Sequence, residues 1–305
     1  MKEQHSFDTK SENGILYLIP TPIGNLGDMT IRAVDTLKHV DLIAAEDTRN
    51  TQKLLNHFQI ETKQISFHEH NTMQRIPELV EKLKQGVSIA QVSDAGMPSI
   101  SDPGHELVVA CIQENINVVP LPGANAGLTA LIASGLSPQP FYFYGFLPRK
   151  TKEQKTALDS LKNREETVII YEAPHRLKRT LKDLSESFGA NRKAVLCREL
   201  TKKHEEFIRG TFLELNQWAD TDQIRGEFVI IIQGNPQPVK ENFSDPLENL
   251  SLNEQVDYLM KQDNSLSVNQ AIKKVAKRHS LRKQVVYNEY HRIDKEGQSD
   301  GSKGI

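Results

Sequence analysis

Four polar clusters interrupt otherwise apolar segments, and each holds side chains that can move protons or bind phosphate. They are IAAEDTRNT at 43–51, HEH at 68–70, YEAPHR at 171–176 and CRELTKKHEE at 197–206. Carboxylates and imidazoles can act as general bases, whereas arginine and lysine pair with phosphate oxygens. Each cluster follows a predicted strand, and α/β active sites lie at the carboxyl ends of strands. Together the clusters predict a polar reaction crevice.

Each cluster also has a purely structural interpretation. His68 and His70 could ligate a metal, but one His-x-His pair without a third ligand is a weak signal, and we expect no metal. Two acid–base pairs have the i, i+3 spacing of ion pairs on a helix, namely Glu46–Arg49 and Glu199–Lys202. No nucleophile elbow and no kinase signature occurs in the sequence.

Three segments rich in glycine, proline and small residues leave predicted strands in the first half of the chain, at 17–30, 92–104 and 120–135, and the last of them runs into a predicted apolar helix at 126–134. Small residues let a ligand approach the backbone and the start of a helix. In the second loop we expect Asp102 to cap a helix and Pro103 to be its first residue. That loop alone could be an ordinary strand-to-helix connection, but three such loops indicate one crevice. Neither a dinucleotide fingerprint nor a P-loop motif is present.

The composition describes a soluble globular protein. The chain has 305 residues with 37% hydrophobic and 26% charged residues and a net charge of −2, enough for two domains. No apolar run approaches the roughly 20 residues that cross a bilayer, and the polar segment 1–13 reads as a disordered leader, not a secretory signal. Cys111 and Cys197 lie far apart in apolar patterns, which predicts buried, reduced thiols. We therefore expect a cytoplasmic protein without membrane contact.

Two series of predicted strands divide the body of the chain. The first series is 15–19, 42–45, 64–67, 87–92 and 118–121. Helical patterns lie between these strands, which predicts a mostly parallel sheet covered on both faces. The second series is more closely spaced and predicts a mixed sheet, with strands at 141–146, 167–171, 193–196, 207–212 and 227–232. The fold class is therefore α/β, with an N-terminal lobe at 14–122 and a second lobe at 123–234.

The C-terminal part reads differently. A Pro-containing linker at 235–250 precedes a small helical module at 251–294 and a disordered tail at 295–305. We expect helices capped by Ser251 and Ser267, and a third that starts at Ser280. Residues 251–292 include eight Lys or Arg and four Asp or Glu, which gives this segment a net charge of +4. Such a module suits phosphate contact, although a basic solvated helix face is the simpler alternative. The proposed contacts are Lys273, Lys274, Arg282 and Lys283.

Seven motifs occur in the order seen in the tetrapyrrole-methylase-like superfamily: TPIGNLGDMT, AAEDTR, VSDAGMPSISDPG, PLPGANA, FYGFLPRK, YEAPHR and RELTKKHE. In detail the chain resembles the bacterial 16S rRNA (cytidine-2'-O)-methyltransferases, densely over 14–234 and more loosely beyond. The resemblance implies two αβα lobes with S-adenosyl-L-methionine bound in the cleft between them. It also implies a homodimer that acts on 16S rRNA or on the small ribosomal subunit.

Site residues follow from the motif match. The resemblance implies cofactor contacts from four loops, at Pro22, Gly24, Asp94, Ala95, Gly96, Ser101, Asp102, Ala124 and Asn125. Met97, Ser101 and the pair Ala124-Asn125 differ from the residues of many relatives, which affects side-chain contacts more than backbone contacts. The candidates for the base that accepts the ribose proton are Glu46, Asp47, His68 and Glu172. The candidates for the flanking phosphates are Arg49, Arg176 and Lys202.

Two other functions stay open at this point. One is a methylase of the same fold that acts on carbon atoms of a tetrapyrrole or corrin precursor, which would not need the basic module. The other is a non-catalytic RNA-binding assembly protein that keeps a cofactor pocket for folding.

Overall fold

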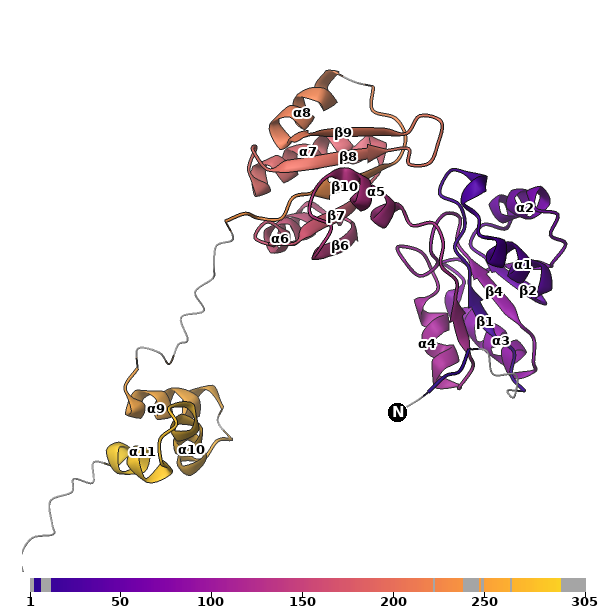
Figure 1. Cartoon of the computed structure of the whole chain (residues 1–305). Helices are drawn as coiled ribbons and strands as arrows, with labels where there is room; N and C mark the ends of the chain where they lie inside the picture. Colours follow the sequence, from indigo (N-terminus) through magenta and orange to yellow (C-terminus); the bar gives the residue numbers. More distant parts are fainter. Residues whose placement is uncertain are drawn as a thin grey trace, which may run out of the picture. The chain divides into compact units, whose positions relative to one another are not determined.

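The computed structural model describes residues 3–6, 12–221, 223–237, 247, 250–263 and 265–291. The chain forms two compact units, Met1–Pro238 and Val239–Ile305 (Figure 1). The predicted tail at 295–305 lies outside the described residues, as do most of the predicted leader at 1–13 and most of the predicted linker at 235–250.

The first sheet is wholly parallel, as the alternating pattern predicts. Its strands are β1 (Leu16–Leu18), β2 (Leu42–Ala45), β3 (Gln64–Ser66), β4 (Ile89–Val92) and β5 (Val118–Pro120), in the order β3-β2-β4-β1-β5. One core cluster joins this sheet to α1 (Ile31–His39) and α2 (Thr48–His57). A second cluster joins it to α3 (Thr72–Lys84) and α4 (His105–Gln113), so helices cover both faces.

The second sheet is mixed, which the closer strand spacing predicts. Its strands are β6 (Phe141–Phe146), β7 (Thr167–Glu172), β8 (Lys193–Arg198), β9 (Glu206–Thr211) and β10 (Phe228–Ile232), in the order β6-β7-β10-β8-β9. Only β6 and β7 pair in parallel among these strands. Helix α5 (Ala126–Ser134) packs on one face; α6 (Thr151–Leu161), α7 (Pro174–Phe188) and α8 (Phe212–Thr221) pack on the other.

Two predicted helix starts are wrong. Helix α4 begins at His105 with Gly104 as its N-cap, so Pro103 is not its first residue and Asp102 does not cap it. The backbone turns at Gly104 (φ +140), where a Cβ would collide with the amide of Gln91, and that amide donates a hydrogen bond to the Pro103 carbonyl. The close approach of Gln91 therefore decides where the helix can begin.

The third helix of the basic module also begins later than predicted. Ser280 has a left-handed conformation (φ 54), and the Leu281 N–H donates to the Ala276 carbonyl at 2.9 Å. These contacts close the preceding helix, because a left-handed residue followed by such a bond is a standard helix end. Helix α11 then spans Lys283–Tyr290, after α9 (Leu252–Gln262) and α10 (Val268–Arg278).

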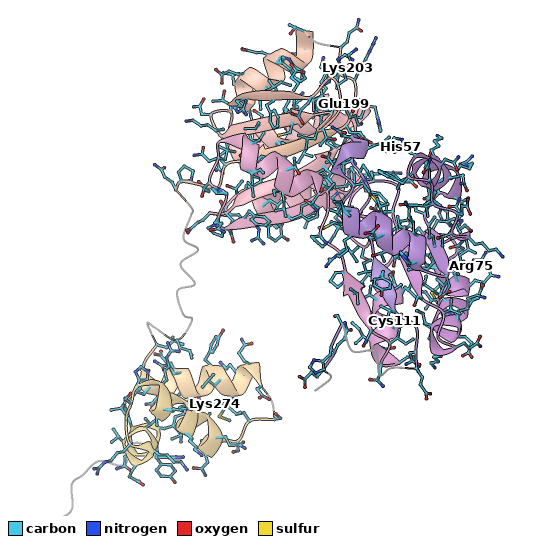
Figure 2. All side chains as sticks on the ribbon, turned by 45° about the vertical axis from the view of Figure 1, so that its right-hand side comes forward. His57, Arg75, Cys111, Glu199, Lys203 and Lys274 are labelled. Atoms are coloured by element: carbon cyan, nitrogen blue, oxygen red, sulfur yellow. The ribbon has the colours of Figure 1, made fainter. Side chains whose placement is uncertain are left out.

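The three C-terminal helices share a small apolar core that includes Val256, Ile272, Val275 and Val286. The Ser251–Glu254 capping box begins α9 as predicted. Lys274 lies on the outer surface of α10 (Figure 2), and the other proposed phosphate contacts of this unit are exposed as well. Cys111 and Cys197 are buried and free, which confirms that prediction. Within the described ranges, no helix is long and apolar enough to cross a membrane.

Candidate active site

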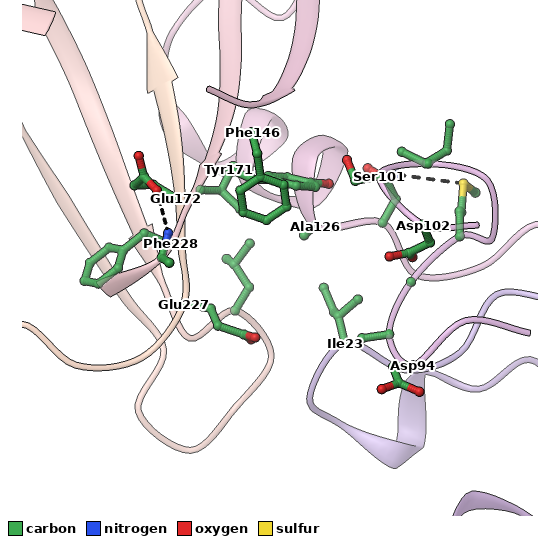
Figure 3. A pocket seen from close by; sticks show the side chains of 18 of the residues that line it. Ile23, Asp94, Ser101, Asp102, Ala126, Phe146, Tyr171, Glu172, Glu227 and Phe228 are labelled. Atoms are coloured by element: carbon green, nitrogen blue, oxygen red, sulfur yellow. Dashed lines mark hydrogen bonds between the residues drawn. The ribbon is translucent and has the colours of Figure 1, made fainter. Parts of the chain in front are cut away.

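A cavity of about 400 Å³ is lined by loops of the first lobe and by strand ends of the second lobe (Figure 3). The first lobe contributes the end of β2 and the loop that follows β4. The second lobe contributes the ends of β6, β7, β8 and β10. Three of the four polar clusters, those at 43–51, 171–176 and 197–206, contribute residues to this cavity. No residue of the cluster at 68–70 lines it, so the prediction that all four meet in one crevice is wrong for that cluster.

Six of the nine predicted cofactor contacts line this cavity: Asp94, Ala95, Gly96, Ser101, Asp102 and Asn125. Pro22 and Gly24 line a neighbouring hollow of about 260 Å³ that also includes Asp94. Ala124 lines neither, although its carbonyl lies 3.9 Å from the position of a Cβ on Gly96.

Hydrogen bonds between backbones hold together two first-lobe loops that carry predicted cofactor contacts. Thr21 and Gly96 exchange N–H···O bonds of 2.9 and 3.0 Å, and the Thr21 hydroxyl donates to the Ser93 carbonyl at 3.0 Å. Gly96 has φ +85, a left-handed conformation that side chains disfavour. Asn125 caps α5 by accepting the Leu128 N–H at 2.8 Å. Both loops therefore present ordered backbone to the cavity.

Asp94 links the ends of β2 and β4. Its N–H donates to a Glu46 carboxylate oxygen at 3.2 Å, and its own carboxylate accepts the Asp47 N–H at 3.1 Å. The Asn50 amide donates to the second Asp94 oxygen at 3.0 Å. These reciprocal bonds fix the direction of both carboxylates.

Burial makes two acids of the cavity reluctant to ionise. It raises the pKa of Glu46, and the nearby charges of Asp94 and Asp47 add to this against the opposing hydrogen bond from Asp94 N–H. Burial also raises the pKa of Asp102 to about 7, assisted by the charge of Glu46 and opposed by a hydrogen bond from Ser93. Glu46, Asp94 and Asp102 therefore form an acidic wall of the cavity.

The four candidates for the base are placed very differently. Glu46 and Glu172 line the cavity, whereas Asp47 and His68 do not. Asp47 caps α2 and pairs with Arg49 through contacts of 2.7 and 3.1 Å, and these bonds lower the pKa of Asp47 to about 2. His68 takes part in the turn after β3, where its backbone N–H donates to Asn71 Oδ1 at 2.9 Å.

The Glu172 carboxylate is buried and already occupied. It accepts the Thr180 hydroxyl at 2.6 Å and the Ala173 N–H at 2.9 Å, and Arg176 Nε lies 3.5 Å away. A carboxylate with this many donors is well suited to holding the turn between β7 and α7.

The three cations proposed for flanking phosphates also differ. Arg49 is exposed apart from its pair with Asp47, and Arg176 donates to the carbonyls of Leu147 and Pro148 at 3.1–3.3 Å. Lys202 lines the cavity, where its ammonium bridges Glu199 and Glu227 at 2.9 Å each. Burial would lower the pKa of Lys202, but these two bonds outweigh it and raise the pKa, so Lys202 stays charged.

Two aromatic residues of the cavity were missed by the sequence reasoning. The Tyr171 hydroxyl accepts the Gly127 N–H of α5 at 3.0 Å, and Phe146 lies at the end of β6 beside it (Figure 3). The signal for Tyr171 was its position at a strand end next to Glu172. The signal for Phe146 was the aromatic run FYFYGF.

Among the residues that the structure describes, no group of three or more His, Cys, Asp or Glu side chains could hold a metal ion. His68 and His70 have ring centroids 6.0 Å apart.

The model of the family described as Tetrapyrrole (Corrin/Porphyrin) Methylases matches residues 15–216. Among curated relatives, Ribosomal RNA small subunit methyltransferase I of Bacillus subtilis (strain 168) is 53% identical over 291 residues, covering 95% of this chain and 99% of the relative. The protein of the same name from Synechocystis sp. is 54% identical over 242 residues, covering 78% and 87%.

Solved structures show the same fold at much lower identity. Uroporphyrin-III C-methyl transferase from Thermus thermophilus, complexed with S-adenyl homocysteine, has a TM-score of 0.52 at 15% identity over 72% of this chain and 97% of that one. The methyltransferase CobJ has a TM-score of 0.56 at 16% identity, covering 72% and 94%. On the family match and the near full-length identity, this chain belongs to the tetrapyrrole methylase family, among the relatives named ribosomal RNA small subunit methyltransferase I.

Proposed function

We propose that this protein transfers the methyl group of S-adenosyl-L-methionine to the 2'-hydroxyl of a cytidine ribose in 16S rRNA. The observation that carries the proposal is the 53% identity over 95% of the chain with a small-subunit rRNA methyltransferase. A cavity at the strand ends, lined by six of the nine residues that the resemblance assigns to the cofactor, supports it.

Three properties of the cavity suit S-adenosyl-L-methionine: its volume, the accessible backbone at Gly96 and its acidic side chains. Its volume of about 400 Å³ lies in the range of small-molecule sites, roughly 300–1,000 Å³. A Cβ on Gly96 would have no neighbour closer than 3.5 Å, so a ligand can approach the backbone there. The acidic wall of Glu46, Asp94 and Asp102 would attract the positive charge of a sulfonium or ammonium. When bound, the cofactor supplies a methyl group that is already activated.

The protein's share of the reaction is to orient the ribose and to accept its proton. Orientation of reacting groups can supply roughly 7–11 kcal/mol, and a positioned base typically adds ~10²–10⁴-fold. Of the four candidate bases, Glu46 is the one that combines a place in the cavity, a raised pKa and a second carboxylate oxygen, Oε1, to which no donor of the described residues is hydrogen-bonded. Asp102 is a second acceptor of the same kind. Lys202 would face a phosphate.

The decisive experiment measures transfer of a tritiated methyl group. Small ribosomal subunits from a strain that lacks this methyltransferase are compared with a tetrapyrrole precursor as acceptor, and the labelled nucleotide is mapped. We expect label on a cytidine ribose of the RNA. Label on the tetrapyrrole would support the same-fold alternative, and RNA binding without transfer would support the assembly protein.

We also propose that the protein is a cytoplasmic homodimer, because its proposed substrate lies in the bacterial cytoplasm and the resemblance implies a dimer. Leu128 and Ile132 lie one turn apart on α5 and are 45% and 80% exposed, so this helix offers apolar surface that a second copy would cover. Light scattering of the wild type and of Ile132→Asp tests this: a monomeric wild type would contradict it.

A further inference from the structure

Phe146 is an exposed aromatic ring at a reaction cavity. It is 53% exposed, yet its ring packs edge-on against Tyr171 with centroids 5.6 Å apart. Figure 3 shows the Phe146 ring beside Tyr171 on the second-lobe side of the cavity, across from Asp94 and Asp102. Of the predicted cofactor contacts that line the cavity, Asp94, Ala95, Gly96, Ser101 and Asp102 come from the first lobe and only Asn125 from the second, so Phe146 is not among the residues assigned to the cofactor.

An irregularity in β6 directs Phe146 toward the cavity. The register of β6 against β7 shifts between Phe143 and Gly145, and Gly145 has φ +81. In a regular strand residues 143 and 146 would lie on opposite faces. Here both rings contact Tyr171, at 5.1 and 5.6 Å between centroids. Bulges of this kind re-aim side chains next to active sites.

A buried network then holds the segment that follows Phe146. The Arg176 guanidinium donates to the Leu147 carbonyl at 3.1 and 3.2 Å and to the Pro148 carbonyl at 3.3 Å. Arg176 also pairs with the buried Glu172, which accepts the Thr180 hydroxyl at 2.6 Å. The ring is therefore presented on ordered backbone, which spares the ordering cost that a loose side chain would incur on binding.

We propose that Phe146 is the platform on which the base of the target nucleotide stacks. This rests on the proposed function, in which a ribose hydroxyl must enter the cavity. Enzymes that act on a base rotate it out of its stack, and unstacked RNA bases are commonly received by aromatic side chains. A nucleotide whose ribose hydroxyl enters this cavity would leave its stack in the same way. The base would then lie on the second lobe, on the opposite side of the ribose from the acidic wall.

The test compares three variants of Phe146 with a matched control. Phe146→Ala removes the ring, Phe146→Leu keeps apolar bulk without a π-face, and Phe146→Trp keeps the π-face. Phe141→Ala is the control, because Phe141 is 41% exposed on the same strand but does not line the cavity. The readouts are the KM and kcat for unmethylated small subunits and the Kd of S-adenosyl-L-methionine measured by calorimetry.

We expect Phe146→Ala and Phe146→Leu to raise the KM for subunits by roughly 5- to 100-fold, with cofactor Kd unchanged. Phe146→Trp and Phe141→Ala should stay near the wild type. A weakened cofactor Kd in Phe146→Ala with unchanged KM for subunits would instead place the ring against the cofactor. Equal KM and Kd in all variants would overturn the proposal. A wild type that transfers no methyl group to RNA would contradict the proposed function itself, which separates the two failures.

Discussion

Asp102 is an acid of the cavity whose ionisation should lower the stability of the fold. It lines the cavity with Glu46 and Asp94, and burial raises the pKa of Asp102 to about 7. A carboxylate whose folded pKa lies above its ordinary value of 3.8 binds its proton more tightly in the folded state. The contribution of Asp102 to the free energy of unfolding is therefore fully present below pH 3.8, and it is lost as the pH rises to about 7.

Asp102→Asn should consequently raise the melting temperature above pH 7, because it removes a buried charge beside two other acids. The gain over the wild type should shrink as the pH falls toward 3.8, below which Asp102 is protonated in both states. Thermal melts between pH 4 and 8.5 measure this. A difference that does not change with pH would show that Asp102 is not a buried titrating group.

Glu46→Gln should lower kcat by ~10²–10⁴-fold if Glu46 accepts the ribose proton. The Kd of the cofactor should change much less than kcat, because the amide keeps the volume of the side chain. The matched variant is Asp47→Asn, next in the chain but outside the cavity and paired with Arg49. It should lose stability at the start of α2 more than rate. Single-turnover rates beside thermal melts separate the two effects, and a full-rate Glu46→Gln would leave Asp102 as the acceptor.

At the scale of elements, the loop after β4 brings glycine backbone to the cavity. Gly96→Val should weaken cofactor binding measured by calorimetry, because a side chain there occupies the space next to Ile23 and strains a residue with φ +85. Gly189→Val is a matched control, since Gly189 has φ +92 but open space around its Cβ and lies at the end of α7. Both variants should lose stability. Equal cofactor affinity in the two would remove this loop from the site.

The turn between β7 and α7 is held by a buried ion pair. Arg176→Met should destabilise the protein by on the order of 3 kcal/mol, because it leaves the buried Glu172 carboxylate without its partner. Arg179→Met lies one turn away on the same helix, where its pair with Asp183 is 3.7 Å long and mostly exposed, so it should cost far less. Urea unfolding of both variants measures the difference. A similar, small loss in each would contradict the structural role of Arg176.

At the scale of the whole molecule, the basic helical unit is the part that a tetrapyrrole methylase acting on a small molecule would not need. Its predicted phosphate contacts are exposed on α10 and at the start of α11. Contacts with phosphates release counterions, so they make RNA affinity depend on salt.

Charge reversal of the basic unit tests this role. Changing Lys273, Lys274, Arg282 and Lys283 to Glu should weaken RNA binding and flatten its salt dependence by ~0.7 per lost contact. The cofactor Kd should stay unchanged, since these residues lie outside the unit that holds the cavity. A control with the same change in net charge reverses four exposed lysines of the first unit, namely Lys155, Lys178, Lys182 and Lys193. An RNA affinity and salt dependence equal to the wild type in the variant of the basic unit would confine recognition to the first unit, and an equal loss in both quadruple variants would reduce the effect to net charge.

Much of the architecture is local information that the sequence already determined. Strand 42–45, strand 141–146 and helix 126–134 have the bounds that their patterns predict, and both sheets have the predicted strand direction. Apolar periodicity and turn residues act over a few neighbouring positions, so they can be recognised in the sequence without knowledge of the fold. The ordered motifs determined the family as well, because seven short patterns in one order are jointly very specific.

Only the tertiary structure decided which residues meet. Glu46 and Asp47 are neighbours in sequence, yet one faces the cavity and the other caps a helix and pairs with Arg49. The choice depends on Asp94, 47 residues further along the chain, whose bonds orient both. Phe146 reaches the cavity only because β6 shifts its register against β7. Such long-range contacts set the direction of a side chain after an irregular turn or bulge. Local periodicity in the sequence does not predict them.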